Sequence, residues 1–182
     1  VKKEIQSLLQ QANFYAFNLA KNNQSTYRRI LLVRKDHIEN LEKIIADNRT
    51  WVVSIKSAGN ILRGENFVYA FPEVTLNKNI TRKGEVIARE NIYLSGFDSE
   101  SIRKKIKLLL SSTLAEVKRR GSLSSELKIN ANQINNLGKS LVDKKTGDFQ
   151  IIAKAMDNSQ SADKVPISLE LKSLEKVSKN KN

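Results

Sequence analysis

Near Thr50 the apolar residues of this 182-residue chain change their spacing, and this change limits the folds that it can adopt. Before Thr50 they recur every three or four residues, as in amphipathic helices, and after it they alternate, as in strands. Three consecutive strands are predicted there, over residues 51–58, 66–74 and 85–94, and a helix over 98–120 follows them. The pattern therefore predicts an α+β or α/β fold, in which a long helix packs across a mixed, mostly antiparallel sheet.

The middle strand carries apolar residues on both of its faces. Phe67, Tyr69 and Phe71 point to one side, and Val68 and Ala70 point to the other. A strand with one polar face borders solvent, whereas a strand that is apolar on both faces is covered on both. We therefore expect this strand at the centre of the sheet with both faces buried, and Pro72 at its end or at a bulge.

Shorter elements complete the order of the chain. Helices are predicted over 2–20, 35–48 and 132–142, and strands over 29–33, 126–129, 148–156 and 165–171. The resulting order, βββαβαβ from the first long strand onward, is that of the ribonuclease-H-like fold. Nucleases of that fold hold two metal ions between carboxylates on the first strand and near the fourth. Trp51–Ala58 and Leu127–Ile134 contain no Asp or Glu, and Lys56 and Lys128 stand where the metal ligands belong. We therefore expect at most the fold without its catalytic acids.

The residue types of most catalytic centres are scarce in this chain. It has no cysteine, which excludes disulfides and thiolate chemistry, and one histidine, His37, which argues against catalytic triads and zinc sites. The seven glycines are scattered and form no phosphate-binding loop. We therefore predict that the chain is not an enzyme and has no catalytic, metal-binding or cofactor-binding residues, and we interpret His37 as an exposed helix residue.

Basic residues outnumber acidic ones by 32 to 19, and the net charge is +13. Such a charge favours polyanionic partners such as nucleic acid. The helix over 98–120 carries a solvent-facing basic stripe, formed by Arg103, Lys104, Lys107 and Lys118. No aromatic residue lies among them, so the stripe could bind a phosphate backbone only non-specifically. A second explanation is compositional, because the chain is rich in Lys, Asn and Ile, which A/T-rich codons encode, and its charge is spread along its length.

Three segments are predicted along the chain. Residues 1–22 form a helical extension, in which Ile5, Leu8, Ala12, Tyr15 and Leu19 follow the spacing of heptad a and d positions. We expect this extension to be the end of a coiled coil and to join copies of the chain into a homo-oligomer. Residues 23–172 form a single globular domain, and residues 173–182 form a disordered, charged tail.

The most distinctive segment is Trp51–Glu65, whose sequence is WVVSIKSAGNILRGE. Together with weaker matches at Gln10–Phe17 and Leu108–Gly121, this segment resembles the C-terminal domain of an uncharacterised cyanobacterial family. Members of that family carry membrane helices near the N-terminus, then a long coiled coil, then a globular end, and no activity is established for them. The resemblance implies a non-catalytic scaffold or interaction domain at the end of a membrane-tethered coiled coil in the cell envelope.

Within that segment Asn60 and Arg63 are candidates for partner contacts, because loops on rigid scaffolds often carry binding residues. The alternative is structural, since Gly59, Asn60 and Gly64 are residues that a tight connection between two strands requires. The resemblance implies that only segments upstream of Val1 contact the membrane. It does not specify on which side of the membrane the domain lies. Two functions from different classes follow: an interaction domain with a protein partner, and a non-specific nucleic-acid-binding module that uses the basic stripe.

Overall fold

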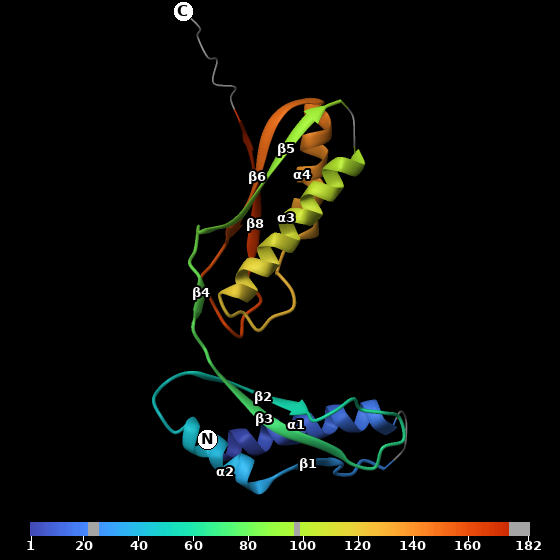
Figure 1. The fold of residues 1–182 in the computed structure, drawn as a ribbon, viewed down its shortest axis with the longest axis vertical. Coiled ribbons are helices and arrows are strands. Elements are labelled where there is room, and N and C mark those ends of the chain that lie inside the picture. The colour runs from blue at the N-terminus through green and yellow to red at the C-terminus, as the bar shows by residue number, and fades with distance from the viewer. Residues whose placement is uncertain (22–25, 97–98, 175–182) are drawn as a thin grey trace, which may run out of the picture. The chain divides into compact units, whose positions relative to one another are not determined.

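A computed structural model describes residues 1–21, 26–96 and 99–174 of the chain. The chain divides into two compact units, Val1–Asn77 (unit 1) and Lys78–Asn182 (unit 2), drawn as ribbons in Figure 1. Unit 1 contains α1 (Lys2–Lys21), β1 (Leu31–Val33), α2 (Lys35–Ile44), β2 (Trp51–Ser57) and β3 (Val68–Leu76). Unit 2 contains β4 (Asn79–Thr81), β5 (Val86–Ser95), α3 (Ser99–Arg119), α4 (Ala131–Lys144), β6 (Thr146–Ala155), β7 (Ser159–Gln160) and β8 (Ile167–Ser173).

Both units confirm the predicted α+β class, but their strands form separate sheets. The sheet orders are β1-β3-β2 in unit 1, and β4-β7 and β5-β6-β8 in unit 2. These pairs are antiparallel except for β1 with β3. The single sheet centred on the three consecutive strands is therefore wrong, because β2 pairs with β3 whereas β5 pairs with β6. The ribonuclease-H-like order fails for the same reason, and the strand expected over 126–129 is a single bridge between Lys128 and Pro166.

Helix α1 packs against one face of the β1-β3-β2 sheet (Figure 1). The small side chains of Ala16 and Ala20, with Phe17 between them, share a core with Ile30 and Val68. The helical extension expected over 1–22 is therefore wrong as far as the helix is described, because α1 supplies Ala16, Phe17 and Ala20 to the core of unit 1. The single domain expected over 23–172 is likewise wrong, since unit 2 has its own hydrophobic clusters.

The buried face of α1 differs from the expected heptad stripe. Ile5 is buried as a heptad seam would require, but Tyr15 and Leu19 are exposed. The residues that face the sheet instead include Asn13 and Ala16. The two stripes share their first members and then diverge, because the buried residues follow the 3.6-residue period of an α-helix and not the 3.5-residue repeat of a coiled coil.

Asn13 joins α1 to the start of β1 by hydrogen bonds. Its Oδ1 accepts from the backbone N–H groups of Ile30 at 2.8 Å and Leu31 at 2.9 Å. Its Nδ2 donates to the Tyr27 hydroxyl at 2.8 Å and to the Arg28 carbonyl at 3.3 Å. One buried amide thus satisfies backbone groups that apolar packing would leave unpaired.

In unit 2, α3 and α4 cover one face of the β5-β6-β8 sheet (Figure 1). As predicted, α3 turns an apolar stripe inward: Ile102, Ile106, Leu109 and Val117 are buried, and Leu110 and Leu114 are half-buried. The opposite face of the sheet is mostly polar, apart from Ile152 and Tyr93, with a hydrogen bond of 2.9 Å from Gln150 Nε2 to Asn91 Oδ1 and an ion pair of 2.6 Å between Lys154 and Glu170. The predicted last strand with one polar face is therefore confirmed in β8.

The C-terminal end is ordered further than expected. Ser173, which should begin the disordered tail over 173–182, belongs to β8. The Leu174 N–H donates a hydrogen bond of 2.8 Å to the Asp148 carbonyl. The rest of the expected tail, residues 175–182, lies outside the described residues.

The two units meet in sequence at one peptide bond. The Asn77 N–H donates to the Thr50 carbonyl at 2.9 Å, within unit 1. The Lys78 N–H donates to the Ser161 hydroxyl at 3.3 Å, and the Lys78 carbonyl accepts from the Ser161 N–H at 2.9 Å, within unit 2. The chain therefore passes from one set of hydrogen bonds to the next without a linker.

Candidate interaction surfaces

Three aromatic side chains lie on the face of the β1-β3-β2 sheet that α1 leaves uncovered. Phe67 is 59% exposed, Tyr69 68% and Phe71 40%, whereas Val68 and Ala70, which alternate with them, are buried against α1. Strand β3 is central, as predicted, but the expectation that both of its faces are covered is wrong. We refer to the surface formed by Phe67, Tyr69 and Phe71 as the aromatic face.

Pro72 lies in this central strand without interrupting its hydrogen bonds. The Tyr69 carbonyl accepts from Ala58 on the β2 side, and the Val68 N–H donates to Ile30 on the β1 side. Because these directions alternate along a strand, the backbone of Pro72 faces the β1 side. Strand β1 stops pairing at Ala70, so the missing N–H of Pro72 has no partner there to lose.

Lys56 and Glu73 add one charge of each sign to the aromatic face. Lys56 lies directly opposite Phe71 in the β2–β3 register, and Glu73 is two residues further along β3. Residues with these positions share one face of a sheet. The Lys56 Nζ and the Glu73 Oε2 are 3.6 Å apart, and both side chains are about half exposed. The aromatic face is therefore bordered by a balanced pair of charges.

Of the two loop candidates, the structure brings only Asn60 to the aromatic face. Asn60 shares a hollow of about 270 Å³ with Phe67 and Tyr69. Arg63 is exposed in the turn beside Gly64 and does not line this hollow. Gly64 has a φ of +90°, which favours glycine, so a tight connection accounts for its place in the sequence.

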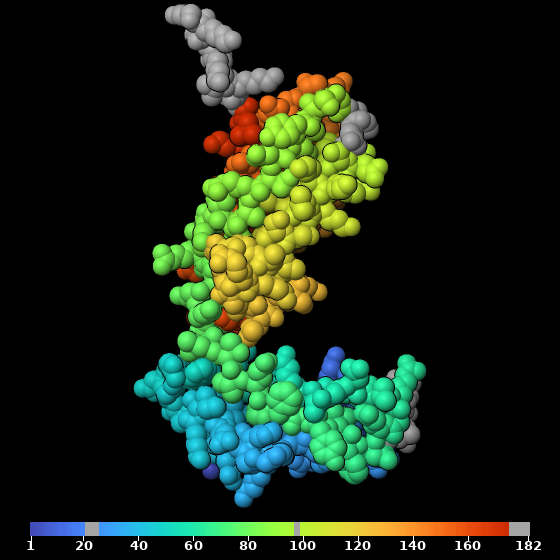
Figure 2. Space-filling view, in the orientation of Figure 1, coloured from blue at the N-terminus to red at the C-terminus, as the bar shows by residue number. Residues whose placement is uncertain are grey.

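The four cations predicted on α3 are all exposed, and Figure 2 shows much of the outer surface of this helix in yellow. Arg103 and Lys107 lie one turn apart and border a groove between α3 and α4. Lys104 does not border the groove, and Lys118 is about 16 Å further along the helix than Lys107. The structure thus places two of the four cations at one site and adds Lys139 of α4, which sequence reasoning missed.

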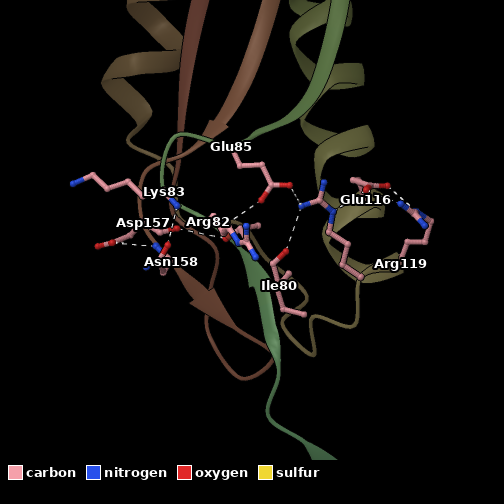
Figure 3. Close-up of polar contacts among 10 residues, drawn as sticks. Ile80, Arg82, Lys83, Glu85, Glu116, Arg119, Asp157 and Asn158 are labelled. Carbon is pink, nitrogen blue, oxygen red and sulfur yellow. Dashed lines mark hydrogen bonds and ion pairs between the residues drawn. The ribbon is translucent and has the colours of Figure 1, made fainter.

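The cations at the end of α3 have structural partners (Figure 3). Arg119 Nε and Arg120 Nε each donate to the Glu116 carboxylate at 2.8 Å, and these bonds lower the pKa of Glu116 to about 2. Arg120 Nη1 also donates to Glu85 Oε1 at 2.7 Å and to the Ile80 carbonyl at 3.3 Å. Arg120 thereby joins the end of α3 to β4 and to Glu85, which precedes β5, whereas Arg119 is paired within the helix.

Among residues 1–21, 26–96 and 99–174, no group of three or more His, Cys, Asp or Glu side chains is arranged to hold a metal ion. His37, which we expected to be exposed, is half-buried, because it lines a hollow of about 210 Å³ with Leu41 and Phe71. The buried Nδ1 of His37 has no hydrogen-bond partner in the described part of the chain. No second titratable group lines this hollow, so His37 forms no acid–base pair there.

Comparisons with known proteins give a relative without a stated activity. The chain is 34% identical over 108 residues to the uncharacterized protein alr4393 of Nostoc sp. (strain PCC 7120). The match covers 58% of this chain and 22% of that cyanobacterial protein, so the chain spans about a fifth of its relative's length. No family model and no solved structure matches the chain. Within the described residues, no helix has both the length and the apolar character needed to cross a bilayer.

Proposed function

We propose that this chain is a non-catalytic interaction domain that associates with copies of itself through the aromatic face. The observation that carries this proposal is the row of exposed rings at Phe67, Tyr69 and Phe71. Tyr69 and Phe71 alternate along β3 and are therefore about 6.7 Å apart, and Phe67, directly before the strand, lines the same hollow as Tyr69, so the three rings form one apolar strip. Contiguous exposed apolar surface of this kind marks contact sites more often than inert surface.

The charges beside the strip favour a second copy as the partner. In a two-fold interface, residue i of one copy contacts residue j of the other copy, and residue j of the first contacts residue i of the second. A face that carries both signs of charge is therefore complementary to itself. Lys56 of one copy would meet Glu73 of the other, because both lie on this face. A phosphate backbone would instead meet the carboxylate of Glu73, which opposes nucleic acid as the ligand of this face.

The size of the strip predicts weak association. With about 200 Å² for a fully exposed ring, the three rings offer roughly 330 Å² per copy. Two such surfaces fall short of the roughly 1,200 Å² that stable complexes bury, so we expect a dissociation constant of about 10–100 μM. Weak contacts of this kind become effective when copies are tethered together, because a tether raises their effective concentration into the millimolar range.

We further propose such a tether: a coiled coil, anchored in the membrane of the cell envelope, that carries this domain at its end. The proposal is supported by the resemblance of Trp51–Glu65 and by the length of the Nostoc relative, of which the match covers 22%. Full-length protein should then sediment with membranes and resist a carbonate wash. Recovery of the full-length protein in the supernatant would contradict the anchor.

Self-association is best tested by sedimentation velocity over a concentration series from 5 to 500 μM. The wild-type chain should show a reversible monomer–dimer equilibrium, and the triple variant Phe67→Ser/Tyr69→Ser/Phe71→Ser should stay monomeric. The matched control is Tyr93→Ser, because Tyr93 is also 68% exposed on a strand but lies in unit 2. A monomeric wild type at 500 μM, or an unchanged dimer of the triple variant, would refute the proposal.

A nucleic-acid-binding module is the second candidate, because all four cations of the basic stripe are exposed. If each neutralises one phosphate, the logarithm of the binding constant falls with the logarithm of salt concentration with a slope of about −3 to −4. In that case reversal of charge at Lys104 weakens DNA binding as much as reversal at Lys107. This equality separates the second candidate from the inference below.

A further inference from the structure

The groove between α3 and α4 has an apolar floor and a basic rim. Its volume is about 470 Å³. The floor is apolar on both sides, with Ile102, Ile106 and Leu110 from α3, and Ile134, Gly138 and Val142 from α4. The rim is formed by Arg103, Lys107 and Lys139. This groove lies entirely within unit 2, so it is separate from the aromatic face.

The spacing of the floor residues suits a helix as the occupant. On each of the two helices the floor residues recur every four positions, which is the spacing of the ridges that guide helix packing. Each row spans eight residues, or about 12 Å, which is slightly more than two helical turns. A third helix could therefore place apolar residues at i, i+4 and i+7 or i+8 along the groove.

Gly138 provides a vacancy in the middle of this floor. A Cβ atom added at Gly138 would meet nothing within 4 Å. The residue lies in the interior of α4, where glycine lowers helix stability by about 1 kcal/mol relative to alanine. An apolar side chain of a bound helix could enter the space that the missing side chain leaves.

The charges of the lining select an acidic occupant. Three of the lining side chains are cationic, and no Asp or Glu lines the groove. The acidic residues of the two helices are Glu100, Glu116 and Asp143, all outside the lining, and Glu116 is bonded to Arg119 and Arg120. A carboxylate on either flank of an occupant would therefore meet a cation.

We propose that the α3–α4 groove binds an amphipathic helix of a partner protein, with its apolar stripe on the floor and acidic residues along both flanks. This site goes beyond the self-association proposed for unit 1, since it uses other residues and recognises another kind of partner. The bound helix would lie in the groove between α3 and α4 and contact residues of both helices.

The probe is a fluorescein-labelled, N-acetylated 15-residue helix with leucines at positions 4, 8 and 11, glutamates on both flanks and alanine elsewhere. Fluorescence anisotropy with the full chain should give a dissociation constant below about 100 μM. A peptide with lysine in place of every glutamate should bind at least tenfold more weakly. Gly138→Leu should weaken binding of the acidic peptide at least tenfold without lowering the melting temperature, because leucine fills the floor and favours the helix.

Two matched variants test whether the effect is local to the groove. Ser140→Leu adds the same side chain to an exposed position of α4 and should change the dissociation constant less than twofold. Lys107→Glu should weaken binding of the acidic peptide at least tenfold, whereas Lys104→Glu, next to Arg103 in sequence but outside the lining, should change it less than twofold. These surface substitutions keep the test valid if Gly138→Leu fails to fold.

Three outcomes would overturn the proposal. The first is a dissociation constant above 1 mM for the acidic peptide. The second is equal binding of the acidic and lysine peptides, which would indicate non-specific apolar contact. The third is that duplex DNA or phosphatidylglycerol vesicles compete for the chain and Lys104→Glu weakens the peptide as much as Lys107→Glu, which would indicate a general polyanion surface along α3.

Discussion

Leu109→Ala should destabilise unit 2 by about 3–4 kcal/mol and leave unit 1 unchanged. Leu109 has no exposed surface and lies in the middle of α3. The cluster around it contains Ile92 and Ile151 of the sheet and Leu137 and Leu141 of α4. Because these neighbours belong to other elements on two sides, the cavity left by the substitution cannot collapse fully. The loss in the free energy of unfolding therefore lies in the middle to upper part of the range for Leu→Ala substitutions at buried positions.

The position of the single tryptophan makes this prediction measurable unit by unit. Trp51 begins β2, so its fluorescence reports the unfolding of unit 1, whereas far-UV circular dichroism reports both units. With a denaturant dependence of about 1.5 kcal/mol per molar urea, the dichroism transition of unit 2 should move down by about 2–2.7 M. The fluorescence midpoint should not move. Leu123→Ala, at a 47% exposed position of unit 2, is the control and should shift neither signal by more than about 0.5 kcal/mol.

Two results would refute the reasoning. An equal shift of the Trp51 fluorescence would mean that the units unfold as one cooperative structure and that their cores are not independent. A shift of less than about 1 kcal/mol in the dichroism transition would mean that Leu109 is not enclosed as described.

Two further predictions concern polar groups. The pKa of Glu116 is lowered from 4.5 to about 2 in the folded chain, so its contribution to stability is complete above pH 4.5 and is lost as the pH falls toward 2. The melting temperatures of wild type and Glu116→Gln should therefore differ at pH 6 and converge near pH 2; a constant difference would exclude this linkage. Asn13→Ala should destabilise unit 1 by about 2–4 kcal/mol in urea titrations followed by Trp51 fluorescence, because the N–H groups of Ile30 and Leu31 lose their acceptor. A change below 0.5 kcal/mol would mean that water replaces the amide.

Most helices and strands of this fold could be predicted from the sequence, because an element that is buried on one side carries apolar residues at a regular spacing. Ile102, Ile106 and Leu109 recur at helical spacing, and they are the residues that α3 buries. Strand partners are different, because they are chosen by contacts between distant segments. Strand β5 has the same alternating pattern whether it joins β3 or β6, so its placement in a second sheet could not be inferred from its own residues.

The candidate surfaces were predictable to different degrees. Arg103 and Lys107 stand out in sequence as cations on an amphipathic helix, but the groove that they border exists only once α4 lies beside α3. The aromatic face illustrates a deeper limit, because Phe67, Tyr69 and Phe71 alternate with Val68 and Ala70. Apolar residues on both sides of a strand indicate two covered faces, and only the position of α1 shows which face is left open. The burial of Asn13 could not be predicted, because nothing in its sequence neighbours distinguishes a buried amide from an exposed one.

The direct connection between Asn77 and Lys78 determines how fast a protease can cleave the chain between its two units. Proteases cut segments that can leave their own hydrogen bonds and enter a cleft in extended form. Here the Asn77 N–H is held by Thr50, and both backbone groups of Lys78 are held by Ser161. Cleavage between the units must therefore wait for one of these pairs to open. The rate of that cut thus reports the local unfolding of an edge in one unit, and fragments that correspond to the two units should accumulate only as fast as that edge frays.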